Sequence, residues 1–142
     1  MVGTYLVVRD HEWRQDKNGV LKAASRLQYP LFVKPARGGS SIGISRVTSP
    51  EGLEAAIEPA RDRDRKVLIE QGIHGREIES AVLDGRHGAA PRASLPGEIV
   101  VHDPDGFYDF EAKYLSGEQK ASVQSRAELD DASRIRVQNV SN

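Results

Sequence analysis

Apolar residues recur along the chain in short runs separated by turn-forming residues. The runs favour extended segments because they alternate with polar residues or are rich in β-branched and aromatic side chains. Strands are predicted at residues 5–9 (YLVVR), 31–34 (LFVK), 43–47 (GISRV), 67–70 (VLIE), 76–82 and 98–102. The second and third flank a glycine-rich turn and therefore predict a β-hairpin with an unusual tip.

Helical periodicity is found in two segments between the predicted strands. One apolar side consists of Val20, Leu21, Ala24 and Leu27, and the other of Leu53, Ala56, Ile57 and Ala60. Thr48 and Glu51 have the spacing of a capping box that starts the second helix. Pro59 removes a backbone donor, so the pattern predicts a kink or an early end there. A third helix is expected near Asp130. Together, these strands and helices predict an α+β fold.

Composition limits the classes of function that fit this chain. It has 142 residues, 38% of them hydrophobic, and a formal net charge of -1. This balance disfavours nucleic-acid and membrane-surface partners. No cysteine is present, which excludes disulfides and thiolate sites, and no apolar run has the length of a membrane span. We expect one folded unit in a cytoplasmic protein.

Lys34 closes an apolar strand and is followed by Gly38, Gly39, Ser40 and Ser41. Glycines let the main chain approach a ligand, hydroxyl groups add donors, and an ammonium attracts phosphate oxygens. The segment therefore indicates a polyphosphate site. A flexible hairpin tip with an exposed lysine remains the alternative interpretation.

Two carboxylates bracket a turn in the segment EQGIHGREIE. Glu70 ends a strand, and a strand-end carboxylate can accept from an exocyclic amine or a ribose hydroxyl; Glu77 follows the turn. The turn's backbone can pair with an adenine edge, and Ile73 can pack on the ring. The alternative is that both glutamates are solvated ends of hairpin strands.

Three aromatic residues and a Lys113-Tyr114 pair crowd into FYDFEAKY at 107–114, although only 6% of the chain is aromatic. Exposed aromatics of this density favour a lid that closes over a site and excludes water. Anchoring of a long loop by Phe107 and Phe110 is the structural alternative. The four histidines show no metal-ligand spacing, and no Ser-His-Asp or GxSxG pattern indicates nucleophilic hydrolysis.

In order and spacing, YPLFVKPARGGSSIGISRV, KVLIEQGIHGREIE and FYDFEAKYL resemble the D-alanine-D-alanine ligase family. The likeness extends from Tyr5 to about Leu129 and implies an ATP-grasp fold, with antiparallel sheets and flanking helices. It implies that residues 1–129 are the central nucleotide-binding region. Residues 130–142 would then begin a helix that leads into a C-terminal part.

The resemblance also assigns roles to individual residues. ATP-binding positions are matched by Lys34 at the phosphates, Ser40 and Ser41 in the glycine-rich loop, Glu70, Gln71 and Ile73 at the adenine, and Glu77 at the ribose. Lys113 matches the loop lysine that reaches the terminal phosphates. Tyr108 and Tyr114 lie in the same loop, where the family favours D-alanine over D-lactate as second substrate. Lys113, Tyr108 and Tyr114 are thus the expected catalytic group.

For the parent protein the resemblance implies ATP-dependent joining of two D-alanines through an acyl phosphate, for peptidoglycan synthesis. Two lysines and Mg²⁺ would offset the charge that builds up in both steps. The full-length parent is expected to be a homodimer. No Mg²⁺ ligand is assigned in this chain; the family's metal ligands lie in a C-terminal part absent here.

The family also carries an N-terminal domain that holds the first D-alanine, and this sequence has no counterpart to it. We therefore expect an ATP-binding core truncated at both ends and without ligase activity on its own. A stand-alone nucleotide-binding or interaction module is the alternative from a different class. A sister ATP-grasp carboxylate-amine ligase is a third possibility.

Overall fold

The computed structural model describes residues 3–39, 41–102 and 121–141. Internal packing divides the chain into two compact units, Met1–His74 and Gly75–Asn142. The expectation of one folded unit is therefore wrong. Each unit forms its own sheet structure, and the prediction that helices and strands coexist in an α+β fold is confirmed for both.

The first unit is built on a four-stranded antiparallel sheet. Its strands are β1 (Tyr5–Arg9), β2 (Leu31–Pro35), β3 (Ser45–Val47) and β4 (Lys66–Gln71), in the order β1-β4-β2-β3. All three neighbouring pairs are antiparallel. The predicted strands at 5–9, 31–34 and 67–70 and the β2–β3 hairpin are confirmed. β3 is shorter than predicted and begins at Ser45.

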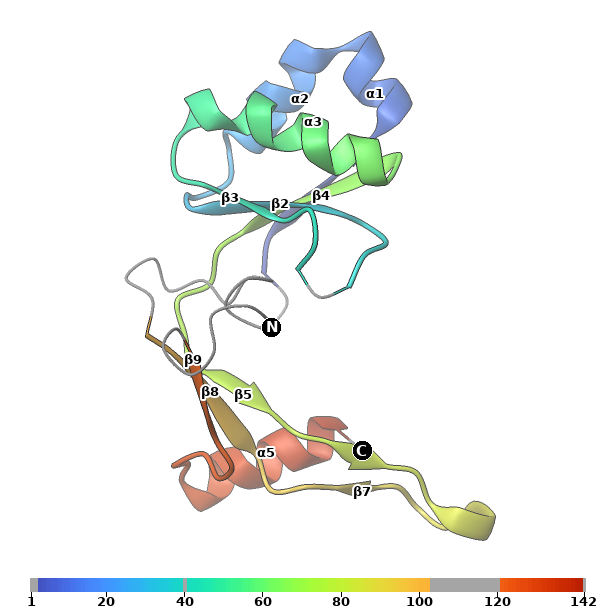
Figure 1. Ribbon diagram of the computed structural model, residues 1–142, viewed down its shortest axis with the longest axis vertical. Helices are drawn as coiled ribbons and strands as arrows, with labels where there is room; N and C mark the ends of the chain where they lie inside the picture. Colours follow the sequence, from blue (N-terminus) through green and yellow to red (C-terminus); the bar gives the residue numbers. More distant parts are fainter. Residues whose placement is uncertain (1–2, 40, 103–120, 142) are drawn as a thin grey trace. The chain divides into compact units, whose positions relative to one another are not determined.

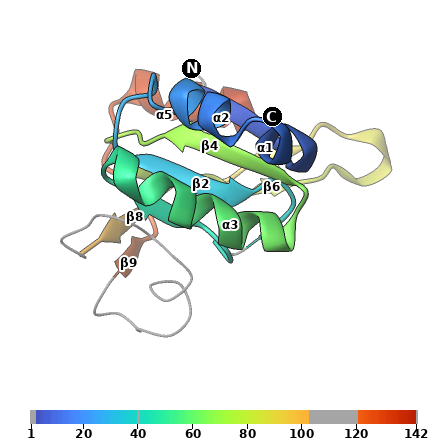
Figure 2. The ribbon, with the colours of Figure 1, turned by 90° about the horizontal axis from the view of Figure 1, so that it is seen from above.

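Three helices cover one face of this sheet (Figures 1 and 2). They are α1 (Asp10–Gln15), α2 (Lys17–Ala24) and α3 (Leu53–Arg63). The core between sheet and helices includes Leu31 and Val33 of β2, Val67 and Ile69 of β4, and Ile57 of α3. Among the described residues of this unit, no helix lies on the other face of the sheet, to which alternate residues of each strand point.

The second predicted helix begins and ends differently from the expectation. A 3-10 turn, η1 (Pro50–Gly52), precedes α3, and Ser49 rather than Thr48 lies just before it without a side-chain capping bond. The predicted capping box is therefore wrong. Pro59 does not end the helix either, because it faces solvent while Ala60 beyond it is fully buried. Burial of the apolar side outweighs one missing hydrogen bond.

The helix α1 has no counterpart in the sequence prediction because it is too short to show a helical period. An ion-pair network fixes it against α3. Arg61 of α3 donates to Asp10 and to Glu58, and Glu58 accepts from the buried Trp13 indole at 3.0 Å. These contacts lower the pKa values of Asp10 and Glu58, chiefly through the Arg61 and Trp13 hydrogen bonds respectively.

The described residues of the second unit form two small sheets and the helix α5. β5 (Glu77–Glu79), β8 (Gly97–Val101) and β9 (Ala121–Gln124) form one sheet, and β6 (Val82–Leu83) with β7 (Arg92–Ala93) forms the other. A 3-10 turn, η2 (Arg86–Gly88), lies between β6 and β7. The helix α5 (Asp131–Ser141) confirms the helix expected near Asp130.

The strand predicted at 76–82 is wrong as a single element, because its residues divide between two sheets. Ser80 and Ala81 lie between the two strand segments. The Ala81 backbone pairs with Ser94, whose hydroxyl accepts from the Ala81 amide at 3.0 Å and whose amide donates to the Ala81 carbonyl at 2.8 Å. The strand expected at 98–102 is confirmed as β8. No helix among the described residues is long and apolar enough to cross a membrane.

Candidate nucleotide site

The sheet face opposite the helices carries a mixture of aromatic, aliphatic and charged side chains. Glu70 is the cross-strand partner of both Tyr5 and Phe32, and Leu68 is the partner of Val7 and Lys34. Because paired residues point to the same face, these side chains share one surface. The register thus places flat apolar area and two opposite charges side by side.

Lys34 and Glu70 form an ion pair at the centre of this face. The Lys34 Nζ lies 2.7 Å from Glu70 Oε2, and the two side chains are 32% and 34% exposed. An ammonium has three donors and a carboxylate accepts several hydrogen bonds, so the pair retains capacity for a further ligand. Lys34 lies within β2 and is paired, which contradicts the alternative of an exposed lysine at a flexible tip.

The glycine-rich segment after β2 is a compact double turn. The Ile42 amide donates to the Gly39 carbonyl at 3.1 Å, and the Ile44 amide donates to the Ser41 carbonyl at 3.3 Å. Ser41 and Gly43 both have left-handed backbones, with φ of 59° and 77°. Successive turns of this kind expose backbone N–H groups, which suits an anionic ligand.

The segment that follows Glu70 leaves the sheet through a tightly packed glycine. A Cβ at Gly72 would lie 2.9 Å from the Pro30 carbonyl oxygen, so only glycine fits. The Gln71 side chain is paired with Gln28, donating to it at 3.1 Å. The Gln71 amide is also paired, donating to the Thr4 carbonyl at 3.0 Å, whereas Ile73 is 74% exposed.

The structure brings together only some of the residues that the sequence indicates. Lys34, Ser41, Glu70, Gln71 and Ile73 belong to the first unit. Glu77 begins β5 in the second unit and is exposed. Ser40, Tyr108, Lys113 and Tyr114 lie outside the described residues.

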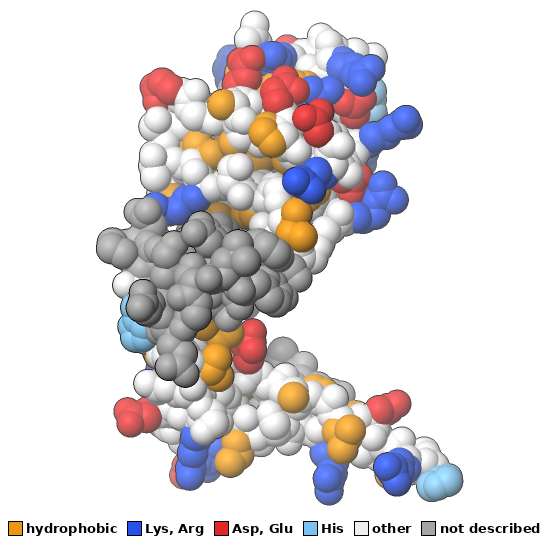
Figure 3. Space-filling model, viewed as in Figure 1, with side chains coloured by type: hydrophobic (Ala, Val, Ile, Leu, Met, Phe, Trp, Pro, Cys, Tyr) orange, Lys and Arg blue, Asp and Glu red, His pale blue; other side chains and the backbone are white. Residues whose placement is uncertain are grey.

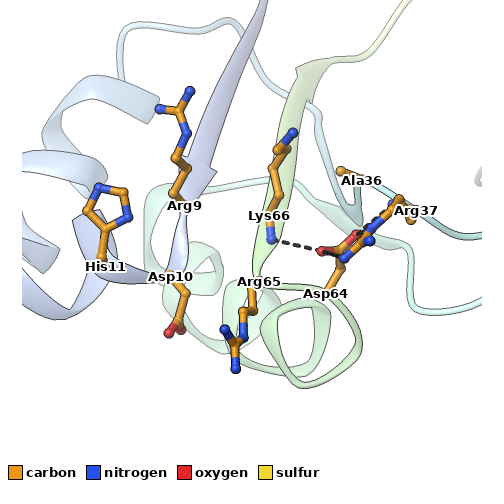
Figure 4. A pocket seen from close by; sticks show the side chains of 8 residues that line it. All are labelled: Arg9, Asp10, His11, Ala36, Arg37, Asp64, Arg65 and Lys66. Atoms are coloured by element: carbon orange, nitrogen blue, oxygen red, sulfur yellow. Dashed lines mark hydrogen bonds and ion pairs between the residues drawn. The ribbon is translucent and has the colours of Figure 1, made fainter.

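The sequence analysis did not identify a hollow of about 460 Å³ at the far end of β1 and β4. It is lined by Arg9, Asp10, His11, Ala36, Arg37, Asp64, Arg65 and Lys66 (Figure 4). None of the residues predicted from sequence lines it. Arg37, one of the lining residues, lies against the buried Asp64. The only sequence signal for this contact is the position of the arginine directly before Gly38.

Metal-binding potential is low in the part of the chain that the structure describes. Within residues 3–39, 41–102 and 121–141, no three His, Cys, Asp or Glu side chains are grouped closely enough to hold an ion.

Comparison with known proteins gives consistent results along the whole chain. A family model described as "D-ala D-ala ligase C-terminus" matches residues 1–142. The D-alanine--D-alanine ligase of Pseudarthrobacter chlorophenolicus is 54% identical over 137 residues, which cover 96% of this chain and 36% of that protein. The corresponding ligase of Kocuria rhizophila is 56% identical over 117 residues, covering 82% and 30%.

Solved structures show the same similarity in three dimensions. The VanG D-Ala:D-Ser ligase of Enterococcus faecalis superposes with a TM-score of 0.72 at 31% identity, covering 97% of this chain and 37% of its own. D-alanyl-alanine synthetase A of Vibrio cholerae also gives a TM-score of 0.72, at 29% identity, covering 98% and 40%. The chain thus spans about a third of the length of its relatives, and the expected ATP-grasp architecture is confirmed.

Proposed function

Because the chain belongs to the D-alanine-D-alanine ligase family, we propose that its first unit binds the adenine nucleotide of an ATP-dependent ligase. The proposed site is the helix-free face of the β1-β4-β2-β3 sheet. One observation carries the proposal: Lys34 and Glu70 meet on that face. They are the residues expected at the phosphates and at the adenine amine.

The residues present fit a nucleotide in chemical type. Lys34 would contact phosphate oxygens, and the turn amides around Ser41 would donate to them. Glu70 would accept from the adenine amine, Gln71 would lie beside the base, and the exposed Ile73 would cover the ring. Glu77 remains the proposed ribose contact from the second unit.

For the whole protein we propose ATP-dependent joining of two D-alanines. When bound, Mg²⁺ would offset phosphate charge during the reaction. Lys113, Tyr108 and Tyr114 remain the proposed catalytic group in the loop. We also propose that the full-length parent is a cytoplasmic homodimer and that its Mg²⁺ ligands lie outside this chain.

The site is tested by comparing ATP with adenosine on the purified chain. Replacing Lys34 by alanine should weaken ATP binding by roughly 10-fold, since a charge-assisted contact to phosphate is lost, and adenosine binding far less. Isothermal titration calorimetry measures both affinities. Lys22→Ala, which removes an exposed lysine on α2, is the control and should change neither. Equal losses for ATP and adenosine would contradict the phosphate role of Lys34.

A related ligase with another second substrate is the competing function, because a D-Ala:D-Ser ligase is among the similar structures. The two are separated by assaying phosphate release by the full-length parent with D-alanine alone and with D-serine or D-lactate added. D-alanine alone should support turnover. Turnover that requires D-serine or D-lactate would favour the related ligase.

A further inference from the structure

Asp64 is a buried carboxylate just beyond the last turn of α3. Its side chain is 2% exposed and accepts four hydrogen bonds. Three come from Arg37: its amide at 2.9 Å, Nε at 3.0 Å and Nη2 at 3.1 Å. The fourth comes from the Lys66 amide at 3.1 Å. The guanidinium of Arg37, followed by the Lys66 amide, lowers the pKa of Asp64 to about 2.

These bonds fix the point at which the glycine-rich loop leaves the sheet. Arg37 is the last residue before Gly38, and the preceding Ala36 donates its amide to the Lys66 carbonyl at 2.9 Å. Asp64 therefore joins the start of the loop to the start of β4. Figure 4 shows the Arg37 side chain lying along Asp64, with dashed lines joining Asp64 to Arg37 and Lys66.

The neighbouring Arg63 contacts the other end of the same loop. A Cβ at Gly43 would lie 2.6 Å from Arg63 Cδ, so the arginine stem packs directly against the Gly43 backbone. Gly43 has a φ of 77°, which an L side chain adopts only with strain. Arg63, the last residue of α3, and Asp64, which follows it, thus hold the exit and the entry of the loop.

We propose that Asp64, assisted by Arg63, is a positioning residue that holds the glycine-rich loop ready to bind phosphate. This inference rests on the proposed nucleotide function and extends it to residues that do not touch the ligand. A loop anchored at both ends loses little conformational entropy when a ligand binds, and that saving appears as affinity. Its base is held at the buried Asp64 carboxylate by the largely exposed Arg37 guanidinium and by two backbone amides.

The test combines Asp64→Ala and Arg37→Gln with the control Asp10→Asn. Arg37→Gln removes the guanidinium and leaves the amide contact to Asp64, so it keeps the test valid if Asp64→Ala does not fold. Asp10 is also held by arginines, at 3.1 Å from Arg61 Nε and 3.0 Å from Arg14 Nε, but these bonds join α1 to α3.

Hydrogen exchange and calorimetry are the two measurements. Asp64→Ala should speed amide exchange at 37–39 and 41–44 by about 10-fold or more and should weaken ATP by ~10-fold, with adenosine nearly unchanged. Arg37→Gln should cause the same changes to a smaller degree. Asp10→Asn should speed exchange in α1 and leave the ratio of ATP to adenosine affinity at its wild-type value.

Two results would overturn the inference. One is unchanged exchange across the loop in Asp64→Ala and Arg37→Gln; the other is an equal loss of ATP and adenosine affinity in a variant that remains folded. A wild-type chain that binds ATP no better than adenosine would instead contradict the proposed function. In that case the exchange data would still show whether Asp64 holds the loop.

Discussion

The two units bury apolar side chains to very different extents. Of the hydrophobic residues buried among those described, all but Ile99 and Ala127 lie in the first unit. Large apolar side chains are exposed in both units: Tyr5, Ile42 and Ile73 in the first, and Val82, Leu83, Leu95, Val123 and Ile135 among the described residues of the second. Part of this apolar surface is visible on the face shown in Figure 3, whereas charges of both signs cover the helices of the first unit.

The difference follows from how many layers each unit has. The first unit places three helices against one sheet, so each inward-facing strand residue finds apolar neighbours. In the described part of the second unit, Arg76 donates from Nε to Glu98 at 2.7 Å and from Nη1 to the Glu128 carbonyl at 2.9 Å.

Loss of core packing should have the largest effect. Ile57→Ala removes a fully buried side chain beneath the sheet, and we expect it to lower the free energy of unfolding of the first unit by about 2–5 kcal/mol. Urea unfolding followed by fluorescence reports on this unit alone, since Trp13 is the chain's one tryptophan. Ile135→Ala, at a 53% exposed position in α5, is the matched control and should change it by less than about 0.5 kcal/mol. Similar losses of unfolding free energy in both variants would contradict the difference in core packing between the two units.

Acid should weaken the first unit through its paired aspartates. The pKa of Asp64 is about 2 in the folded chain, well below its ordinary value of 3.8, and that of Asp10 is also lowered by Arg61. A lowered folded pKa stabilises the fold above the unfolded pKa, and this stabilisation is lost as pH falls through the folded value. The Trp13-monitored free energy of unfolding should therefore decrease from about pH 5 toward pH 2.

Substitution of single carboxylates localises this acid sensitivity. Asp64→Asn should flatten the lower part of the pH profile, since that carboxylate titrates last. Glu98→Gln serves as the control, because the pKa of Glu98 is lowered by Arg76 in the second unit and its loss should leave the Trp13 profile unchanged. If Asp64→Asn leaves the pH profile unaltered, loss of the Asp64 charge is not a cause of the acid sensitivity.

The smallest predicted effect concerns Pro59 in α3. Pro59→Ala restores a backbone donor inside the helix and should stabilise the first unit by ~1 kcal/mol, partly offset by greater freedom of the unfolded chain. Thermal unfolding would detect the change. Pro50→Ala, at the first turn of η1 where proline is well tolerated, should give no gain. Destabilisation by Pro59→Ala would show that proline contributes to the packing of α3.

Local patterns predicted most elements because strands and helices need only neighbouring residues of the right type. The apolar spacing of Leu53, Ala56, Ile57 and Ala60 correctly located the buried side of α3. The same reasoning failed at Pro59, where packing against the sheet outweighed a local signal, and at 76–82, where one alternating run divides between two sheets. In both cases the deciding contacts come from residues far away in the chain.

By itself, the sequence determined most of the strand and helix segments, the family resemblance and the candidate residues Lys34 and Glu70, because these depend on residue type and spacing. Only the tertiary structure decided which charges meet. The antiparallel register of β2 and β4 places Lys34 beside Glu70, and the return of the chain after α3 places Asp64 against Arg37. Such contacts depend on how strands align, and spacing along the chain does not encode that alignment.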